Sequence, residues 1–448
     1  MSGKSPKIVI IGAGSGFGSR LSIDIMSRES LREATIGLCD IHPGRLDNVY
    51  RYVKRTIEHH HLPTRVLASV RRAELLPDAD FVITSVAVGG GAYYGQPYKA
   101  EVEIPLRYGV DQSVADTVGV GAVFRFLRTG PVQQQFFTDM ERLCPGALVL
   151  NHTNPMCMLT WLHCLASKMP YAGLCHGVQD TTKRLAALLD VPYEEVNFKV
   201  AGINHLAWIL ELRRGKEDLY PRLRQLMNEP EKIKGEEVRF DILRHFGYFS
   251  TESNHHDSEY LPYFRRTPEL MAAYHLKSRT VPDQPREREW LKDTGVDGDE
   301  NAPVGELKRS HEYTTGIMEA VLTNRPFTFN GNVMNTGLIT NLPQGCCVEV
   351  PCLVDAHGVQ PCHVGALPPH LAALDRSNIA VQELAVRAVL ERDREAAFLA
   401  CALDPLTASV LPLAKIRAVF EELWQAEKHL LLWFDPAHTG PLPELCAA

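Results

Sequence analysis

The sequence predicts an α/β protein with a Rossmann-like, doubly wound parallel sheet, followed by a C-terminal α+β domain. The first observation is that short apolar runs alternate with helical segments over the first 150 residues. The second is the glycine cluster Gly12–Gly18, which comes directly after one of these runs. The third is the length of 448 residues with 45% apolar and 23% charged residues, an ordinary composition for a large globular enzyme.

The elements of the first half follow from apolar runs and from helical spacing. Short apolar runs bounded by glycine or by an acid are typical of parallel strands buried on both faces. The predicted strands are Lys7–Gly12, Ala34–Asp40, Phe81–Ala87 and Ala147–Leu150. Helical spacing predicts helices over Ser19–Ser27 and Asp47–His59.

The pattern changes after about residue 195. We expect strands at Asn197–Ile203 and Leu206–Leu212, scattered helices over 215–310, a helix at Arg309–Thr323, strand-like pieces in Phe327–Val350, and helices over Asn378–Leu431. The change predicts two domains, a Rossmann-like domain at 1–195 and a C-terminal domain at 196–448. With no linker between them, we expect an extensive interface.

Charge and hydropathy exclude several classes of protein. The 47 Lys and Arg residues against 54 Asp and Glu residues give a net charge of −7, without a basic block that could bind nucleic acid. No apolar stretch reaches the ~18 residues of a membrane span, and no signal peptide precedes the first strand. Eleven cysteines without framework spacing read as reduced thiols. We therefore expect a cytoplasmic protein without nucleic-acid or membrane partners.

The glycine cluster predicts dinucleotide binding. Glycines between a strand and a helix allow a tight turn and a close approach to a pyrophosphate, which then lies on the helix N-terminus. The match is imperfect, because Phe17 takes the third glycine position of the pattern that begins at Gly12. Asp40 ends the next strand and could accept the ribose hydroxyls, which favours NAD over NADP. The alternative is a plain glycine turn beside a surface aspartate.

Three further clusters contain residues that could bind a ligand or take part in a reaction. Thr117–Gly130 is glycine-rich and contains Arg125 and Arg128, so it could form a mobile cationic wall or a solvated turn. The strand ends Cys175-His176 and Asn204-His205 could present a thiolate and an imidazole to one divalent ion with open positions for substrate, or could be core residues. Asp257–Pro262 follows two histidines and could be a capping loop.

Taken together in order, these motifs resemble glycoside hydrolase family four, the NAD- and metal-dependent glycosidases related in fold to lactate and malate dehydrogenases. The resemblance covers nearly the whole chain. Its landmarks are KIVIIGAGS at the start, Asp40, DTVGVGAVFRFLRTGPV, NHTNP, CHGV, GINH, SEYLPYF and GLITNLPQGCCVEVP.

The resemblance implies a role for each matching residue. Cys175 and His205 match the two protein ligands of Mn²⁺ or a similar ion. Tyr260 matches the base that removes a sugar proton, and His176 matches the general acid of α-acting members. Asp257, placed with the catalytic residues, and Arg128 are expected to contact the sugar. The residues expected to bind NAD are Gly12, Gly14, Ser15, Gly16, Phe17, Asp40, Ser85 and Asn154, the last of which also contacts the sugar.

The resemblance also implies a reaction, a substrate class and an assembly. The α-glycosidic bond is broken by transient oxidation at carbon 3 and elimination, so that NAD is not consumed. The His176-Gly177 pair resembles the branch acting on unphosphorylated α-linked uronic acids, with Arg128, Arg265 and Arg266 as candidate carboxylate contacts. A neutral α-glucoside or α-galactoside remains the alternative, as do a lactate/malate-type dehydrogenase and a sensor of NAD or sugar. Relatives of this family suggest a homodimer or homotetramer.

Overall fold

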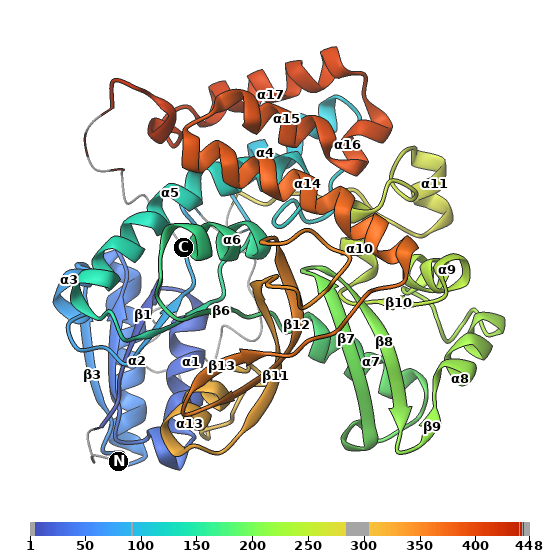
Figure 1. Cartoon of the computed structure of the whole chain (residues 1–448). Coiled ribbons are helices and arrows are strands. Elements are labelled where there is room, and N and C mark those ends of the chain that lie inside the picture. The colour runs from blue at the N-terminus through green and yellow to red at the C-terminus, as the bar shows by residue number, and fades with distance from the viewer. Residues whose placement is uncertain (1–4, 91–92, 284–303, 439, 441, 443–448) are drawn as a thin grey trace.

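The computed structural model describes residues 5–90, 93–283, 304–438, 440 and 442. One mixed sheet runs through these residues, with strand order β10-β8-β7-β12-β11-β6-β5-β4-β1-β2-β3, while β13 pairs with β12 and β9 pairs with β8 (Figure 1). The parallel part of the sheet comes from the first half of the chain, and the antiparallel part comes from the second half.

The parallel part has the strand order of dinucleotide-binding folds. Its strands are β1 (Lys7–Ile11), β2 (Thr35–Cys39), β3 (Arg65–Ser69), β4 (Phe81–Thr84), β5 (Leu148–Asn151) and β6 (Tyr171–Gly173). Spatial order 3-2-1-4-5-6 places a switch point beside β1, where the chain reverses its direction of winding. Ligands bind at the carboxyl ends of strands beside such a point.

Helices cover both faces of the parallel part, as the apolar runs require. Ile8 and Ile10 of β1 belong to a core that includes Leu21 of α1 (Gly16–Met26). The alternate residue Val9 packs in a second core with Phe136 of α5 (Gly119–Leu143). Because both faces of β1 are buried, the strand reads as a continuous apolar run.

The antiparallel part extends the same sheet. Its strands are β7 (Val196–Ile203), β8 (Leu206–Arg214), β9 (Glu217–Asp218), β10 (Phe249–Ser250), β11 (Phe327–Met334), β12 (Cys347–Asp355) and β13 (Gly358–Pro361). The two parts join where β11 pairs with β6 at Asn332 and Gly173. Carboxyl ends of parallel strands therefore lie beside the turn between β7 and β8 and the segment after β10.

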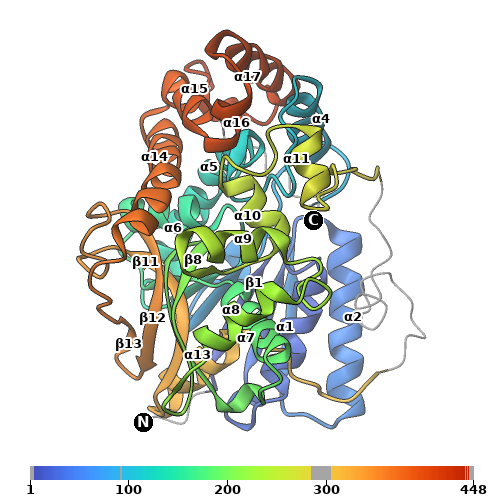
Figure 2. The ribbon, with the colours of Figure 1, turned by 90° about the vertical axis from the view of Figure 1, so that its right-hand side faces the viewer.

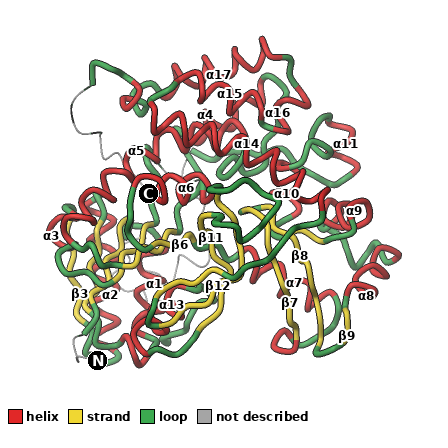
Figure 3. The backbone as a smooth tube through the Cα atoms, viewed as in Figure 1, coloured by secondary structure: helices red, strands yellow, loops and turns green. Residues whose placement is uncertain are grey.

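The remaining helices form a layer above the sheet, or pack along the sheet beside its parallel and antiparallel parts. The upper layer holds α4 (Tyr98–Arg107), α5, α14 (Pro369–Glu391), α15 (Arg394–Leu403), α16 (Pro405–Val410) and α17 (Leu413–Glu427) (Figures 1 and 2). The others are α2 (Pro43–His59), α3 (Arg72–Leu75), α6 (Met156–Ala166), α7 (Gly177–Leu188), α8 (Tyr220–Gln225), α9 (Glu237–Phe246), α10 (Asn254–Tyr260), α11 (Pro268–Ala273) and α13 (Thr314–Thr323). Figure 3 separates this helical layer from the strands below it.

The predicted fold class is confirmed, one local expectation is wrong, and one strand was missed. Thr117–Gly130 is mostly the buried N-terminal part of α5 rather than a loop, because its glycines let the helix pack closely: a Cβ on Gly121 would lie 2.9 Å from the Glu101 carbonyl oxygen. The strand β3 was not predicted, because it is an edge strand with exposed side chains. The domain boundary at 195/196 stays a prediction. No helix in the described ranges is long and apolar enough to cross a membrane.

A buried hydrogen bond ties the antiparallel part to the helical layer. The indole Nε1 of Trp208 on β8 donates to Asp375 Oδ1 of α14 at 3.0 Å, and both side chains are fully buried. We expect Trp208→Phe to lower the free energy of unfolding by about 1–3 kcal/mol, because the acceptor loses its partner. Urea denaturation measures the change. The control Trp433→Phe removes a half-buried indole bond to the Val389 carbonyl and should cost less. Equal losses would contradict the prediction.

Candidate active site

One large cavity lies at the carboxyl ends of the parallel strands. Its volume is about 590 Å³. Phe17, His152 and Asn154 line it from the nucleotide-binding half, and the second half contributes His205 and Glu252 among others. Residues far apart in the sequence therefore share this cavity because the sheet is continuous across the two halves.

Three potential metal ligands converge on the cavity. Cys175 comes two residues after β6, His205 lies in the turn between β7 and β8, and Glu252 follows β10. Their donor atoms all lie within 4.8 Å of one another. The Cys175 thiol donates to Glu252 Oε1 at 3.3 Å, and His205 Nε2 lies 3.7 Å from the same oxygen. The sequence pointed to the cysteine and the histidine but gave no signal for the glutamate.

The electrostatics of this group favour a bound cation. Burial, together with the negative charge of Glu252, raises the pKa of the Cys175 thiol well above its usual value, so the thiol is protonated in the protein alone. Burial by itself would also raise the pKa of Glu252, but His205 and His256 lower it overall. A divalent cation reverses the penalty on the thiol, because metal coordination deprotonates it.

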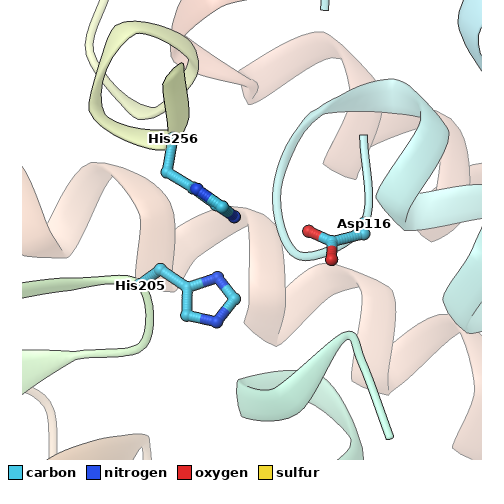
Figure 4. Close-up of side chains that lie close together, drawn as sticks. All are labelled: Asp116, His205 and His256. Atoms are coloured by element: carbon cyan, nitrogen blue, oxygen red, sulfur yellow. The ribbon is translucent and has the colours of Figure 1, made fainter. Parts of the chain in front are cut away.

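A second potential ligand group shares His205. Figure 4 shows the rings of His205 and His256 and the carboxylate of Asp116 facing one another, from the β7–β8 turn, from α10 and from the segment before α5. The Asp116 carboxylate already accepts hydrogen bonds from Tyr93 Oη at 2.9 Å, Asn154 Nδ2 at 3.0 Å and Thr117 Oγ1 at 2.9 Å.

The two histidines of this group keep Asp116 ionised. Burial by itself would raise the pKa of Asp116, but the charges that His256 and His205 can carry lower it to about 2 overall. Its hydrogen bond to Asn154 links the cavity floor to the Asn-Pro motif that follows β5.

The histidine that follows Cys175 has a carboxylate partner. His176 caps the start of α7 on the cavity wall, and its Nδ1 lies 3.2 Å from Glu312 Oε1. The interaction with Glu312 raises the pKa of His176 to about 9, although burial acts in the opposite direction. His176 is therefore protonated at neutral pH, as a proton donor must be. Sequence reasoning did not identify Glu312.

Tyr260 lies beside the potential metal ligands. It ends α10, is buried, and its hydroxyl lies 3.4 Å from His205 Nδ1 and 3.4 Å from the His205 backbone nitrogen. Burial raises the pKa of its phenol well above the usual value in the protein alone. A nearby cation would lower the pKa again, because it stabilises the phenolate.

The glycine cluster adopts the geometry expected of a nucleotide-binding turn. Gly12 has φ of +90°, and a Cβ there would lie 1.9 Å from the Ser85 carbonyl oxygen. The Asp40 carboxylate accepts hydrogen bonds from the backbone nitrogens of Gly14 at 2.8 Å and of His42 at 2.9 Å. A carboxylate has about four lone-pair positions, so Asp40 keeps capacity for further donors.

Phe17, Asn154 and the start of α1 lie at the same end of the sheet. Ser15 is the N-cap of α1 and Gly16 is its first residue. Phe17 and Asn154 both line the large cavity, so this cavity reaches the glycine turn. These expected nucleotide contacts thus lie together at the carboxyl edge of the parallel strands.

Two of the expected sugar contacts lie outside the cavity lining. Arg128 is buried in α5, where Nε donates to Glu101 Oε1 at 2.9 Å and Nη1 donates to the Val88 carbonyl. Asp257, a residue of α10, is fully buried and accepts a hydrogen bond from Ser250 Oγ at 2.8 Å. Both side chains face neighbouring elements, so neither is placed to contact a sugar in this cavity.

Two cationic side chains of the cavity wall belong to the segment 277–280, for which no site was predicted from the sequence. Lys277 and Arg279 line the cavity, and the Arg279 guanidinium lies 5.7 Å from the centre of the Tyr98 ring. The buried Arg265 donates to the Lys277 carbonyl at 3.0 Å and pairs with Asp111 at 2.5 Å. Arg265 therefore positions this segment instead of contacting a substrate carboxylate, and the exposed Arg266 does not line the cavity.

Comparison with known proteins gives consistent matches along the chain. Residues 7–191 match the family model described as family 4 glycosyl hydrolase, and residues 200–407 match the C-terminal domain of that family. The chain is 39% identical to an α-galactosidase of Bacillus subtilis (strain 168), over 94% of this chain and 98% of the relative. It is 30% identical to an α-galacturonidase of Thermoanaerobacterium saccharolyticum, over 95% and 96% of the two chains.

Solved structures match over similar lengths. A 6-phospho-α-glucosidase from gut microorganisms, solved in complex with NAD and Mn²⁺, has a TM-score of 0.79 at 20% identity, covering 95% of this chain and 99% of the other. Malate dehydrogenase of Plasmodium falciparum has a TM-score of 0.52 at 16% identity, covering 88% and 99%. The second match confirms the expected fold relationship to malate dehydrogenases.

The His176–Glu312 pair predicts a titration that can be measured. We expect the pKa of His176 to be about 9. In Glu312→Gln this pKa should fall by more than about one unit, because the charge that stabilises the imidazolium is lost. The stability that this pair contributes is present below pH ~6.5 and is lost as the pH rises through 9. NMR of ¹³C-labelled histidine measures the pKa, with His176→Asn to assign the signal. An unchanged pKa in the variant would contradict the pairing.

Proposed function

This chain belongs to glycoside hydrolase family 4, and we propose that it hydrolyses unphosphorylated α-glycosides with NAD and a divalent cation such as Mn²⁺ as cofactors. The family matches span both halves of the chain, and the chain is a glycoside hydrolase. The observation that carries the proposal is the shared cavity, in which Cys175, His176 and His205 face Phe17 and Asn154 of the nucleotide-binding half.

The start of α1 fits a dinucleotide. Within the described residues, the Ser15 side chain makes no capping hydrogen bond, and the first turn of α1 carries no acid. Backbone N–H groups of that turn are thus free of competing side-chain acceptors, and a helix N-terminus favours anions such as pyrophosphate. The close contact of Gly14 with Asp40 supports an acidic group where a ribose would bind.

The donor set near Cys175 and His205 fits a divalent ion. A thiol and an imidazole within 4.8 Å of each other form a chelating pair that leaves positions open for substrate oxygens. When both cofactors are bound, the nicotinamide can take a hydride from carbon 3 of the sugar and the cation can stabilise negative charge on adjacent sugar oxygens.

The chain's own residues then handle two protons. The Tyr260 hydroxyl lies 3.4 Å from Nδ1 of the cavity-lining His205, and we assign it to removal of the carbon 2 proton. The His176 imidazolium, directly after Cys175 on the cavity wall, is assigned to donating its proton to the departing oxygen. Glu312 orients the ring through Nδ1, so that the other nitrogen, Nε2, faces away from this carboxylate.

The substrate that we propose first is a neutral α-galactoside. The support is the 39% identity to an α-galactosidase over nearly the whole chain. Phosphorylated sugars are disfavoured as substrates. The two relatives that guide this proposal, at 39% and 30% identity, are an α-galactosidase and an α-galacturonidase, and neither name refers to a phosphorylated sugar. The expected uronic acid substrate is thus the second candidate.

A specific observation favours that second candidate. Lys277 and Arg279 bring two cations to the cavity wall, and an arginine holds a carboxylate with two parallel hydrogen bonds. The segment is anchored by Arg265 and Asp111, so its position does not depend on a substrate. A cytoplasmic location and a homodimer or homotetramer remain part of the proposal.

The assignment of Tyr260 predicts a loss of turnover. Tyr260→Phe should lower kcat by about 10²–10⁴-fold, because the proton acceptor is missing, while NAD⁺ affinity stays nearly unchanged. Wild-type turnover in D₂O should place deuterium at carbon 2 of the released sugar. Hydrolysis without this incorporation would indicate a different mechanism. Net accumulation of NADH would instead support a dehydrogenase.

A panel of nitrophenyl α-glycosides tests the substrate. With NAD⁺ and Mn²⁺ under reducing conditions, we expect the highest kcat/KM on the α-galactoside, above the α-glucoside and the 6-phosphates. A preference of about 10²-fold or more for the α-galacturonide would favour the second candidate. A neutral sugar would leave the cation that binds the carboxylate without its charged hydrogen bond, and that loss corresponds to a difference of this size in kcat/KM. Arg279→Met should then abolish the preference. Arg266→Met, which changes an exposed arginine outside the cavity lining, is the matched control.

A further inference from the structure

We propose that Glu252 is a third protein ligand of the divalent cation, together with Cys175 and His205. This inference rests on the proposed function, which places the cation at the cysteine and the histidine. It goes beyond that function, because two protein ligands would suffice for the reaction described above. It also assigns a role to the small residue that follows His176.

The spacing of the three donor atoms matches a shared ion. Glu252 Oε1 lies 3.3 Å from the Cys175 sulfur and 3.7 Å from His205 Nε2. Ligand atoms that each lie about 2.0–2.3 Å from one ion are separated by roughly 3–3.7 Å from each other. The same carboxylate oxygen thus stands at ligand spacing from both proposed donors, and the proton that now links it to the thiol is the one that metal binding removes.

The structure reserves space for this carboxylate. A Cβ on Gly177 would lie 1.6 Å from Glu252 Oε1 and 2.5 Å from its Cδ. Any side chain at position 177 would therefore displace the carboxylate from the two metal ligands. The carboxylate of Glu252 thus occupies the space that a side chain at position 177 would take.

The backbone of Glu252 is held in an uncommon conformation. Its φ is +72°, in the left-handed region that residues with a side chain rarely adopt. Its backbone nitrogen donates to Thr181 Oγ1 at 2.9 Å, and the buried Arg239 donates to its carbonyl oxygen. These contacts fix the direction of the side chain before any cation binds.

The competing ligand group is less suited to a cation. Both oxygens of Asp116 are engaged by the neutral donors of Tyr93, Thr117 and Asn154. The hydrogen-bond donor of the Glu252 carboxylate is instead the Cys175 thiol, itself a ligand. A thiolate at Cys175 and a carboxylate at Glu252 together carry two negative charges, which balance the 2+ charge of the ion. The oxygen ligand from Glu252 favours Mn²⁺ over softer ions.

The affinity for Mn²⁺ alone, without sugar, tests the inference. Calorimetric or electron paramagnetic resonance titration of the full-length reduced protein should show at least about 10-fold weaker Mn²⁺ binding in Glu252→Gln. Gly177→Ala should weaken binding similarly, because its methyl group displaces the carboxylate while the charge is kept. Glu312→Gln removes the same charge from a neighbouring carboxylate and should stay within about 3-fold. Circular dichroism and Tm identify variants that fail to fold.

The outcomes separate this inference from the proposed function. If Cys175→Ala and His205→Ala lose Mn²⁺ affinity while Glu252→Gln and Gly177→Ala keep it, the third ligand is refuted and the proposed metal site stands. If Asp116→Asn weakens binding and Glu252→Gln does not, the cation sits in the competing group and the inference is overturned. If Cys175→Ala binds Mn²⁺ as tightly as wild type, the proposed metal site itself fails.

Discussion

The position of the whole site depends on a close contact at Gly173, where the two parts of the sheet meet. A Cβ at this position would lie 2.6 Å from both Met156 Sδ and Thr160 Oγ1 of α6, and 2.9 Å from the Cβ of Asn332 on β11. Only a residue without a side chain lets β6 pair with β11 while α6 packs on the same strand. Cys175 follows two residues later, so the contact sets where this proposed metal ligand leaves the sheet.

Much of the parallel part of the fold could be predicted from the sequence, because burial on both faces makes its strands read as apolar runs. The predicted strand at Lys7–Gly12 became β1 at Lys7–Ile11, and the predicted helix at Asp47–His59 became the C-terminal part of α2. The failures have local causes. The strand β3 lies at an edge and lacks the apolar run, and α5 contains glycines because it packs closely against α4.

The site could be predicted where its residues follow strand ends, since carboxyl ends of strands gather at one edge. Cys175, His176 and His205 belong to this class and share the cavity. Glu252 and Lys277 lie on irregular segments whose course depends on tertiary contacts with Thr181 and Arg265. Arg128 shows the opposite error, because an arginine in a distinctive motif is used to satisfy the buried Glu101.

The contact between Gly177 and Glu252 has a consequence for how such sequences can diverge. A side chain at the first position and a carboxylate at the second exclude each other in space, so neither position can change freely while the other is kept. A branch that gains a larger residue after the histidine must therefore lose or redirect the glutamate, although the two lie far apart in the chain. Paired substitution at these two positions would thus mark where lineages separated in how they hold their cation.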